Sequence, residues 1–93
     1  MKTIRQDMLE RLEEGSVTAR ELSQYLHIRE HEVYDHLEHL SKTVGSKGMK
    51  LIIEPARCLS CNYLFRDRNK MSPPSRCPKC RMTHLSQPNY KII

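Results

Sequence analysis

Apolar residues recur at the spacing of a helix face in three stretches of the first half of the chain. In the first stretch Ile4, Met8 and Leu12 follow one another at intervals of four, and Gly15 comes just after the pattern stops. Residues four apart lie one above the other on a helix, and glycine is common just past a helix end. The pattern therefore predicts a helix over residues 4–14.

Two further helices are predicted, separated by a turn of three or four residues. Thr18 and Glu21 have the spacing of a capping box, which places the start of a helix over residues 19–26. A third helix is expected over residues 30–43, with Gly45 just beyond its end. One apolar stripe of this third helix is formed by Val33, Leu37 and Leu40.

Two strand candidates lie in the second half of the chain, one on each side of a cysteine-containing segment. Residues 49–54 are apolar and β-branched, and residues 89–93 end the chain with a similar composition. We expect the two to pair antiparallel. Pro55 and Pro88 stand at the junctions with the cysteine segment, where a missing amide donor harms a strand ladder least. The predicted class is α+β.

The second and third helices have the arrangement of a helix-turn-helix. Residues 21–40 resemble winged helix-turn-helix transcriptional regulators, because that family buries the positions held here by Leu22, Leu26, Ile28, Val33, Leu37 and Leu40. The resemblance implies that the third helix can enter the major groove of DNA. Two positions depart from the family: His27 stands where a turn glycine is common, and Arg29 where a Ser or Thr cap is common.

Four cysteines form two C-x-x-C pairs separated by fifteen residues, Cys58 with Cys61 and Cys77 with Cys80. This spacing is typical of a four-thiolate zinc site, in which two tight turns aim four sulfurs at one ion. Such a site has no open coordination position, so the zinc is expected to be structural. Iron in the same sulfur cage is the alternative that the residues leave open.

Residues 57–86 resemble the zinc-ribbon or rubredoxin-like knuckle family, with Cys77 and Cys80 in the more typical knuckle. Nearly the whole chain resembles small archaeal-type predicted regulators that fuse a winged helix-turn-helix to a zinc ribbon. That resemblance implies a three-helix winged helix-turn-helix over residues 1–54, completed by the strand 89–93. The zinc ribbon, residues 55–88, is then inserted in the wing or replaces it. It also implies transcriptional regulation through DNA binding.

Charge is divided unevenly along the chain, although the formal total is only +5. Residues 1–54 hold eight Lys or Arg against ten Asp or Glu, a net −2, whereas residues 55–93 hold eight against one, a net +7. Four thiolates around one zinc ion would lower the second value to about +5. A basic half favours nucleic acid or an acidic protein surface, but simple solvation of a loop-rich module gives the same pattern.

Double-stranded DNA is therefore the expected partner. The candidate contacts are Arg29, His31, Tyr34, Lys42, Lys47, Lys50, Arg66, Arg68, Lys70, Lys79 and Arg81. Three acids, Glu32, Asp35 and Glu38, lie on or beside the exposed face of the third helix and oppose phosphate binding. Two alternatives stay open: a module that docks onto a protein of the transcription machinery, and a rubredoxin-like electron carrier, which requires iron.

Other patterns exclude or weaken further roles. Neither a phosphate-binding glycine loop nor a nucleophile elbow is present, so we expect no enzyme activity and no small-molecule substrate. Neither a signal peptide nor a membrane span is evident, and the cysteine usage suits a cytoplasmic protein without a membrane partner. His31, Asp35 and His39 share a helix face and could bind a second metal, although a solvated face is the simpler interpretation. Tyr63 and Phe65 are expected to pack over the ribbon, and residues 71–75 to form an exposed turn.

Overall fold

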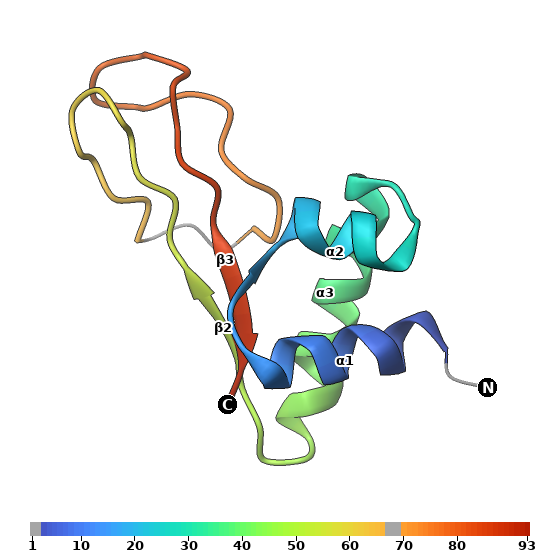
Figure 1. The fold of residues 1–93 in the computed structure, drawn as a ribbon. Coiled ribbons are helices and arrows are strands. Elements are labelled where there is room, and N and C mark those ends of the chain that lie inside the picture. Colours follow the sequence, from blue (N-terminus) through green and yellow to red (C-terminus); the bar gives the residue numbers. More distant parts are fainter. Residues whose placement is uncertain (1–2, 67–69) are drawn as a thin grey trace.

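The computed structural model describes residues 3–66 and 70–93 and combines three helices with a small antiparallel sheet and a long ribbon of loops (Figure 1). The helices are α1 (Ile4–Glu14), α2 (Ala19–Leu26) and α3 (Glu30–Gly45). The strands are β1 (Val17–Thr18), β2 (Leu51–Glu54) and β3 (Asn89–Ile92). This confirms the predicted α+β class of three helices with a ribbon.

The starts of α1 and α2 are set by capping boxes. The hydroxyl of Thr3 accepts a hydrogen bond from the backbone N–H of Gln6, and the Gln6 side chain accepts one from the N–H of Thr3. Thr18 and Glu21 make the same reciprocal pair at the start of α2. Each box satisfies helix N–H groups that have no partner within the helix. Both helices have the predicted bounds.

The turn between α2 and α3 is made by a left-handed residue. His27 has φ 58° and ψ 44°, and its backbone N–H donates to the carbonyl of Ser23. Arg29 is the N-cap of α3 and makes no side-chain capping hydrogen bond. The two departures from the regulator family therefore have a structural counterpart: a histidine takes the conformation that glycine adopts most easily, and the cap of α3 is left to the backbone and solvent.

The end of α3 differs from the prediction, because Gly45 lies within the helix and not beyond it. Val44 is fully buried in the core, which holds the last turn in place. The carbonyl of Val44 accepts hydrogen bonds from the N–H groups of Lys47 (3.0 Å) and Met49 (2.9 Å). Gly48, at φ 77°, is the glycine that reverses the chain here.

The sheet has the strand order β1-β3-β2, and both pairings are antiparallel. Ile53 of β2 and Val17 of β1 both face Tyr90 of the central strand. The predicted pairing of the two late strands is confirmed, and two hydrogen bonds between Lys50 and Ile93 extend it. β1 was not predicted: it has only two residues, and its partner lies more than 70 positions away in the sequence.

The core lies between the three helices and the sheet. Its fully buried members are Met8, Leu12, Leu22, Val33, Leu37, Val44 and Tyr90. Most of these side chains come from the predicted apolar faces of the helices. β3 adds Tyr90 and the nearly buried Ile92, so the last strand of the chain closes a core that the first 45 residues begin. Among the described residues, no helix is both long enough and apolar enough to cross a membrane.

Residues 71–75 are not the plain exposed turn that we predicted. Residues 71–74 are half-buried, and Met71 packs against the helical core. The hydroxyl of Tyr90 donates a hydrogen bond to the carbonyl of Met71. The turn is drawn inward because a thioether side chain fills an apolar gap and a buried phenol needs an acceptor.

Candidate metal centre

The four cysteines lie on two knuckles with the same backbone geometry. In the first, the N–H of Asn62 donates to the carbonyl of Cys58 (2.8 Å), and in the second the N–H of Arg81 donates to that of Cys77 (2.8 Å). Asn62 and Arg81 both have positive φ, 65° and 64°. Asparagine tolerates this conformation well and arginine less well, so the second knuckle carries more backbone strain. Each tight turn aims two sulfurs in one direction.

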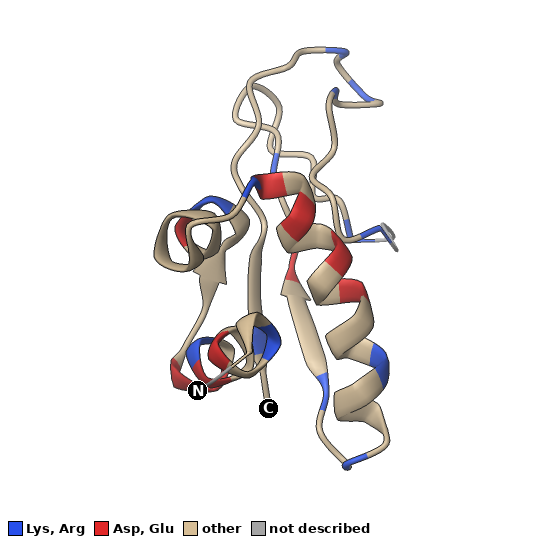
Figure 2. Ribbon diagram, turned by 90° about the vertical axis from the view of Figure 1, so that its right-hand side faces the viewer, with Lys and Arg blue, Asp and Glu red and all other residues tan. Residues whose placement is uncertain are grey.

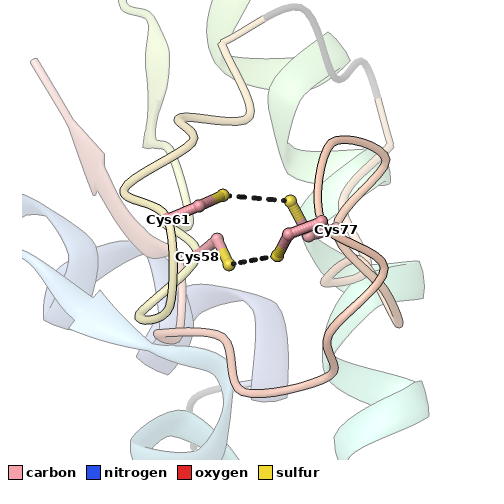
Figure 3. Close-up of side chains that lie close together, drawn as sticks. Cys58, Cys61 and Cys77 are labelled. Atoms are coloured by element: carbon pink, nitrogen blue, oxygen red, sulfur yellow. Dashed lines mark hydrogen bonds between the residues drawn. The ribbon is translucent and has the colours of Figure 1, made fainter.

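The sulfurs of the two knuckles face one another (Figure 3). The Sγ atoms of Cys58 and Cys80 are 3.4 Å apart and those of Cys61 and Cys77 are 3.6 Å apart. All four Sγ atoms lie within 4.8 Å of one another. A tetrahedron with metal–sulfur bonds of about 2.3 Å has edges of about 3.8 Å. The cage therefore fits one tetrahedral ion such as zinc.

The two knuckles are buried in the same way. The first cysteine of each, Cys58 or Cys77, is fully buried, and the second, Cys61 or Cys80, is partly exposed. Backbone hydrogen bonds between the first knuckle and the segment that follows the second knuckle hold the two together. The N–H of Leu59 donates to the carbonyl of His84 (2.9 Å), and Cys58 forms an isolated bridge with Leu85. The cage is thus built from both ends of the ribbon, and it depends on the contacts that hold these two ends together.

The thiols of the cage differ strongly in pKa. Burial acts to raise the pKa of Cys58, but hydrogen bonds from the backbone N–H groups of Cys61 and Ser60 and from neighbouring thiols lower this pKa to about 6. The backbone N–H of Met82 acts to lower the pKa of Cys80, but burial and the other three thiols raise it to about 12. Sulfurs this close oppose one another's ionisation, and a central cation removes that conflict.

The aromatic residues of the ribbon pack beside the first knuckle, as predicted. The rings of Tyr63 and Phe65 meet edge to face, with centroids 5.1 Å apart and an interplanar angle of 88°. The N–H of Phe65 donates to the carbonyl of Ala56 (3.1 Å), which ties this hairpin to the end of β2.

The alternative metal site on α3 is not formed. The sulfur cage is the one cluster of three or more converging metal-ligand residues that the described part of the chain contains. His31 and His39 are exposed, and they line two different hollows. His31, Asp35 and His39 therefore form a solvated face, the simpler of the two interpretations.

The candidate DNA contacts fall into three places. Arg29, His31, Tyr34 and Lys42 belong to the start and the outer face of α3, where Tyr34 is half-buried and the other three are exposed. Lys47 and Lys50 are exposed in the connection from α3 to β2. The exposed candidates of the ribbon are Arg66, Lys70, Lys79 and Arg81; Arg68 lies outside the described residues. Figure 2 shows the basic residues of the ribbon and the row of acids along α3.

One groove of about 620 Å³ brings some of these residues together with residues that the sequence did not mark as a binding site. It runs between α3 and residues 70–72, and it is lined by both acids (Asp35, Glu38) and bases (Lys42, Lys70). Met71 and Ser72 complete it. No sequence signal could have found these two, because their position depends on how the ribbon folds back toward the helix.

Comparisons with known proteins agree with this architecture. The family described as "PF0610-like, N-terminal" matches residues 3–52, and the family described as "PF0610 rubredoxin-like zinc beta-ribbon domain" matches residues 55–93. The solution NMR structure of protein PF0610 from Pyrococcus furiosus is 32% identical and superposes with a TM-score of 0.83, covering 97% of this chain and 88% of that one. No curated protein matches the chain. The chain belongs to the PF0610-like family, and its second half is a rubredoxin-like zinc ribbon.

Proposed function

We propose that the protein is a DNA-binding transcriptional regulator whose ribbon is ordered by one structural zinc ion. The observation that carries this proposal is the origin of the ribbon. It grows out of β2 and β3, the strands that form the wing of a winged helix, and residues 55–93 carry a formal net charge of +7, or about +5 with four thiolates around one zinc ion. A wing lies beside the DNA backbone in winged-helix proteins, so a basic extension from it supports contact with phosphates.

Zinc is the ion that this role calls for. Four thiolates close the coordination shell, which suits a structural ion and leaves no position for a substrate, so we propose no catalytic role. A reducing cytoplasm would keep the four thiols available. Native mass spectrometry should find one zinc ion on a colourless protein. A red protein with visible absorption would instead hold iron and favour the rubredoxin-like electron carrier.

The DNA contacts that we propose are electrostatic and lie mainly outside α3. Lys47 and Lys50 flank the base of the wing, and Lys79 belongs to the second knuckle. Their side chains are exposed, so ion pairing with phosphates would release counterions without breaking internal contacts. α3 itself brings Asp35 and Glu38 to its outer face, so base contacts from this helix are expected to be few.

Binding to random duplex DNA, followed by fluorescence anisotropy over a range of salt concentrations, tests the proposal. The logarithm of the binding constant should fall linearly with the logarithm of the salt concentration. Lys79→Gln should reduce the slope by about 0.9, the value of one phosphate contact, whereas Arg20→Gln on α2 should leave it unchanged. Selection from random sequences then finds any preferred site. No binding at about 50 mM salt would refute the proposal.

The carboxylates of α3 favour a second candidate, a module that docks onto a protein of the transcription machinery. Asp35 and Glu38 are exposed and line the groove beside residues 70–72. Carboxylates repel phosphates and attract a basic protein surface. If DNA is not bound at low salt, this candidate takes precedence, and Glu38→Gln should then weaken the protein complex.

A further inference from the structure

A cavity of about 310 Å³ lies where β2 and β3 pass into the ribbon. Ile53 and Tyr90, which are paired across the two strands, line it from the sheet. Pro55 and Pro88 line it at the two junctions, and Phe65 lines it from the first hairpin of the ribbon. The cavity therefore touches every segment that connects the ribbon to the helical half.

The cavity lining combines apolar walls with positive charge. Most lining side chains are apolar; the polar ones are Tyr90, Ser72 and the two cations Arg66 and Lys70, and no described lining residue is acidic. The hydroxyl of Tyr90 is already engaged, since it donates to the carbonyl of Met71. The cations Arg66 and Lys70 are exposed, so they lie where the cavity meets solvent. The proposed site is defined by described residues only.

Two features of the cavity select the shape of an occupant. Its volume is at the lower end of the range of small-molecule sites, which suits a compact molecule. The ring of Phe65 is held in a fixed orientation by its edge-to-face contact with Tyr63, and the two prolines are rigid. Water in an apolar hollow of this kind finds few hydrogen-bond partners, so a flat apolar body displaces it favourably.

We propose that this cavity binds a small aromatic carboxylate, with the ring among Phe65 and the junction prolines and the carboxylate on Arg66 and Lys70. A guanidinium presents paired N–H donors that match a carboxylate, and a nearby ammonium adds a second positive charge. An inorganic anion would meet the cations but leave the apolar walls uncovered. A neutral ring would cover the walls and leave the cations unpaired.

A ligand bound in the cavity would also affect DNA affinity, an effect that rests on the proposed DNA binding. Arg66 and Lys70 are two of the residues proposed to meet phosphates, so a carboxylate bound to them competes with DNA for the same charges. The ligand would then act as an effector that lowers DNA affinity. The slope of the binding constant against salt should fall in magnitude by at most about 1.8, the value of two phosphate contacts.

Titration of the zinc-loaded full chain with benzoate, followed through backbone amide shifts by NMR, tests the binding site. Saturable shifts are expected for the amides of Ile53, Phe65 and Met71. Acetate, which has the charge without the ring, and benzamide, which has the ring without the charge, should both give much weaker binding. Linear shifts without saturation, or equal shifts with acetate, would overturn the proposal.

Charge variants separate the cavity from the general basicity of the ribbon. Arg66→Gln with Lys70→Gln should weaken benzoate binding about tenfold. Arg76→Gln with Lys79→Gln removes the same charge from ribbon residues that do not line the cavity, and should change the affinity less than twofold. Equal losses in both pairs would overturn the site. Ser72→Leu, which adds apolar volume to a half-buried lining residue, should abolish the shifts while the amide spectrum stays dispersed.

DNA-binding measurements on the same samples test the effector role. Saturating benzoate should weaken binding to random duplex DNA for the native chain and leave the Arg66→Gln, Lys70→Gln variant unaffected. If benzoate binds and the DNA affinity does not change, the effector role is wrong while the site stands. If the native chain binds no DNA at low salt, the proposed function fails, and the benzoate titration still decides the site.

Discussion

The hydroxyl of Tyr90, on the central strand, donates a hydrogen bond to the backbone carbonyl of Met71 in the ribbon. Tyr90 is fully buried, and Met71 packs against the helical core. This bond joins the last strand of the sheet to the segment that connects the two knuckles. The ribbon is therefore anchored to the helical half at a third point, besides the two strand junctions at Pro55 and Pro88.

Removing this anchor should destabilise the protein measurably. Tyr90→Phe keeps the ring and leaves the Met71 carbonyl without its donor, so we expect the free energy of unfolding to fall by about 1–2 kcal/mol. Urea unfolding of the zinc-loaded protein measures the change. Tyr63→Phe is the matched control, because none of the hydrogen bonds found among the described residues involves the Tyr63 hydroxyl. Similar losses in the two variants would show that the bond contributes nothing.

Glycine at position 27 should stabilise the helix-turn-helix. His27 is exposed and left-handed, so His27→Gly loses no packing and relieves the steric cost of a side chain at positive φ. We expect a gain of about 0.5–1 kcal/mol in the free energy of unfolding. His27→Val, with a branched side chain at the same φ, should lower stability by at least about 1 kcal/mol. The opposite order of the two variants in thermal or urea unfolding would contradict the turn geometry.

Chelation of the metal should unfold the ribbon and spare the helices. The ribbon has few buried apolar side chains, whereas the helical half holds the main core. A structural zinc ion supplies about 10–16 kcal/mol of binding free energy in small zinc modules, which the metal-free ribbon would have to do without. In an amide NMR spectrum, peaks from residues 56–66 and 76–86 should collapse while those of α1, α2 and α3 stay dispersed. Ribbon peaks that keep their dispersion after complete metal removal would contradict this.

Metal binding should release protons, and the affinity should rise with pH. The backbone N–H of Tyr63 acts to lower the pKa of Cys61, but burial and the hydrogen bonds that the Cys61 thiol donates to the sulfurs of Cys58 and Cys77 raise this pKa above its ordinary value. The pKa of Cys80 is raised to about 12, so both thiols are protonated before zinc binds. Cys58, with a pKa of about 6, is already a thiolate at neutral pH. Zinc should therefore displace at least two protons per ion at about pH 8.

Calorimetry in buffers of different ionisation enthalpy counts these protons. The affinity should fall as the pH is lowered, and it should fall more steeply below about pH 6, where Cys58 also becomes protonated in the metal-free protein. Release of fewer than two protons would show that the thiols are already ionised in the free chain.

Neutralising a carboxylate on α3 should strengthen DNA binding. Glu38 is exposed on α3, and in the proposed DNA complex its charge would repel phosphates. Glu38→Gln should raise the affinity for random duplex DNA two- to fivefold at about 100 mM salt. Glu13→Gln makes the same charge change on an exposed position of α1 and should have little effect. An equal gain in both variants would mean that only the net charge matters and that α3 does not lie near the DNA.

Much of this architecture follows from short-range patterns. The bounds of α1 and α2 are set by Thr3 and Thr18, whose partners lie three residues away, and the apolar stripes recur at a period that one turn of helix defines. The convergence of the four cysteines was equally predictable, because the knuckle turns that aim the sulfurs are encoded within a few residues of each C-x-x-C pair.

Other features depend on contacts between distant residues. β1 is a strand because Val17 meets Tyr90, Gly45 stays helical because Val44 is buried, and Met71 is drawn inward by Tyr90. The cavity and the groove exist only because the ribbon folds back over the sheet and α3. No local pattern marks such sites, since their walls come from segments that chain connectivity leaves far apart and that packing of the complete fold brings together.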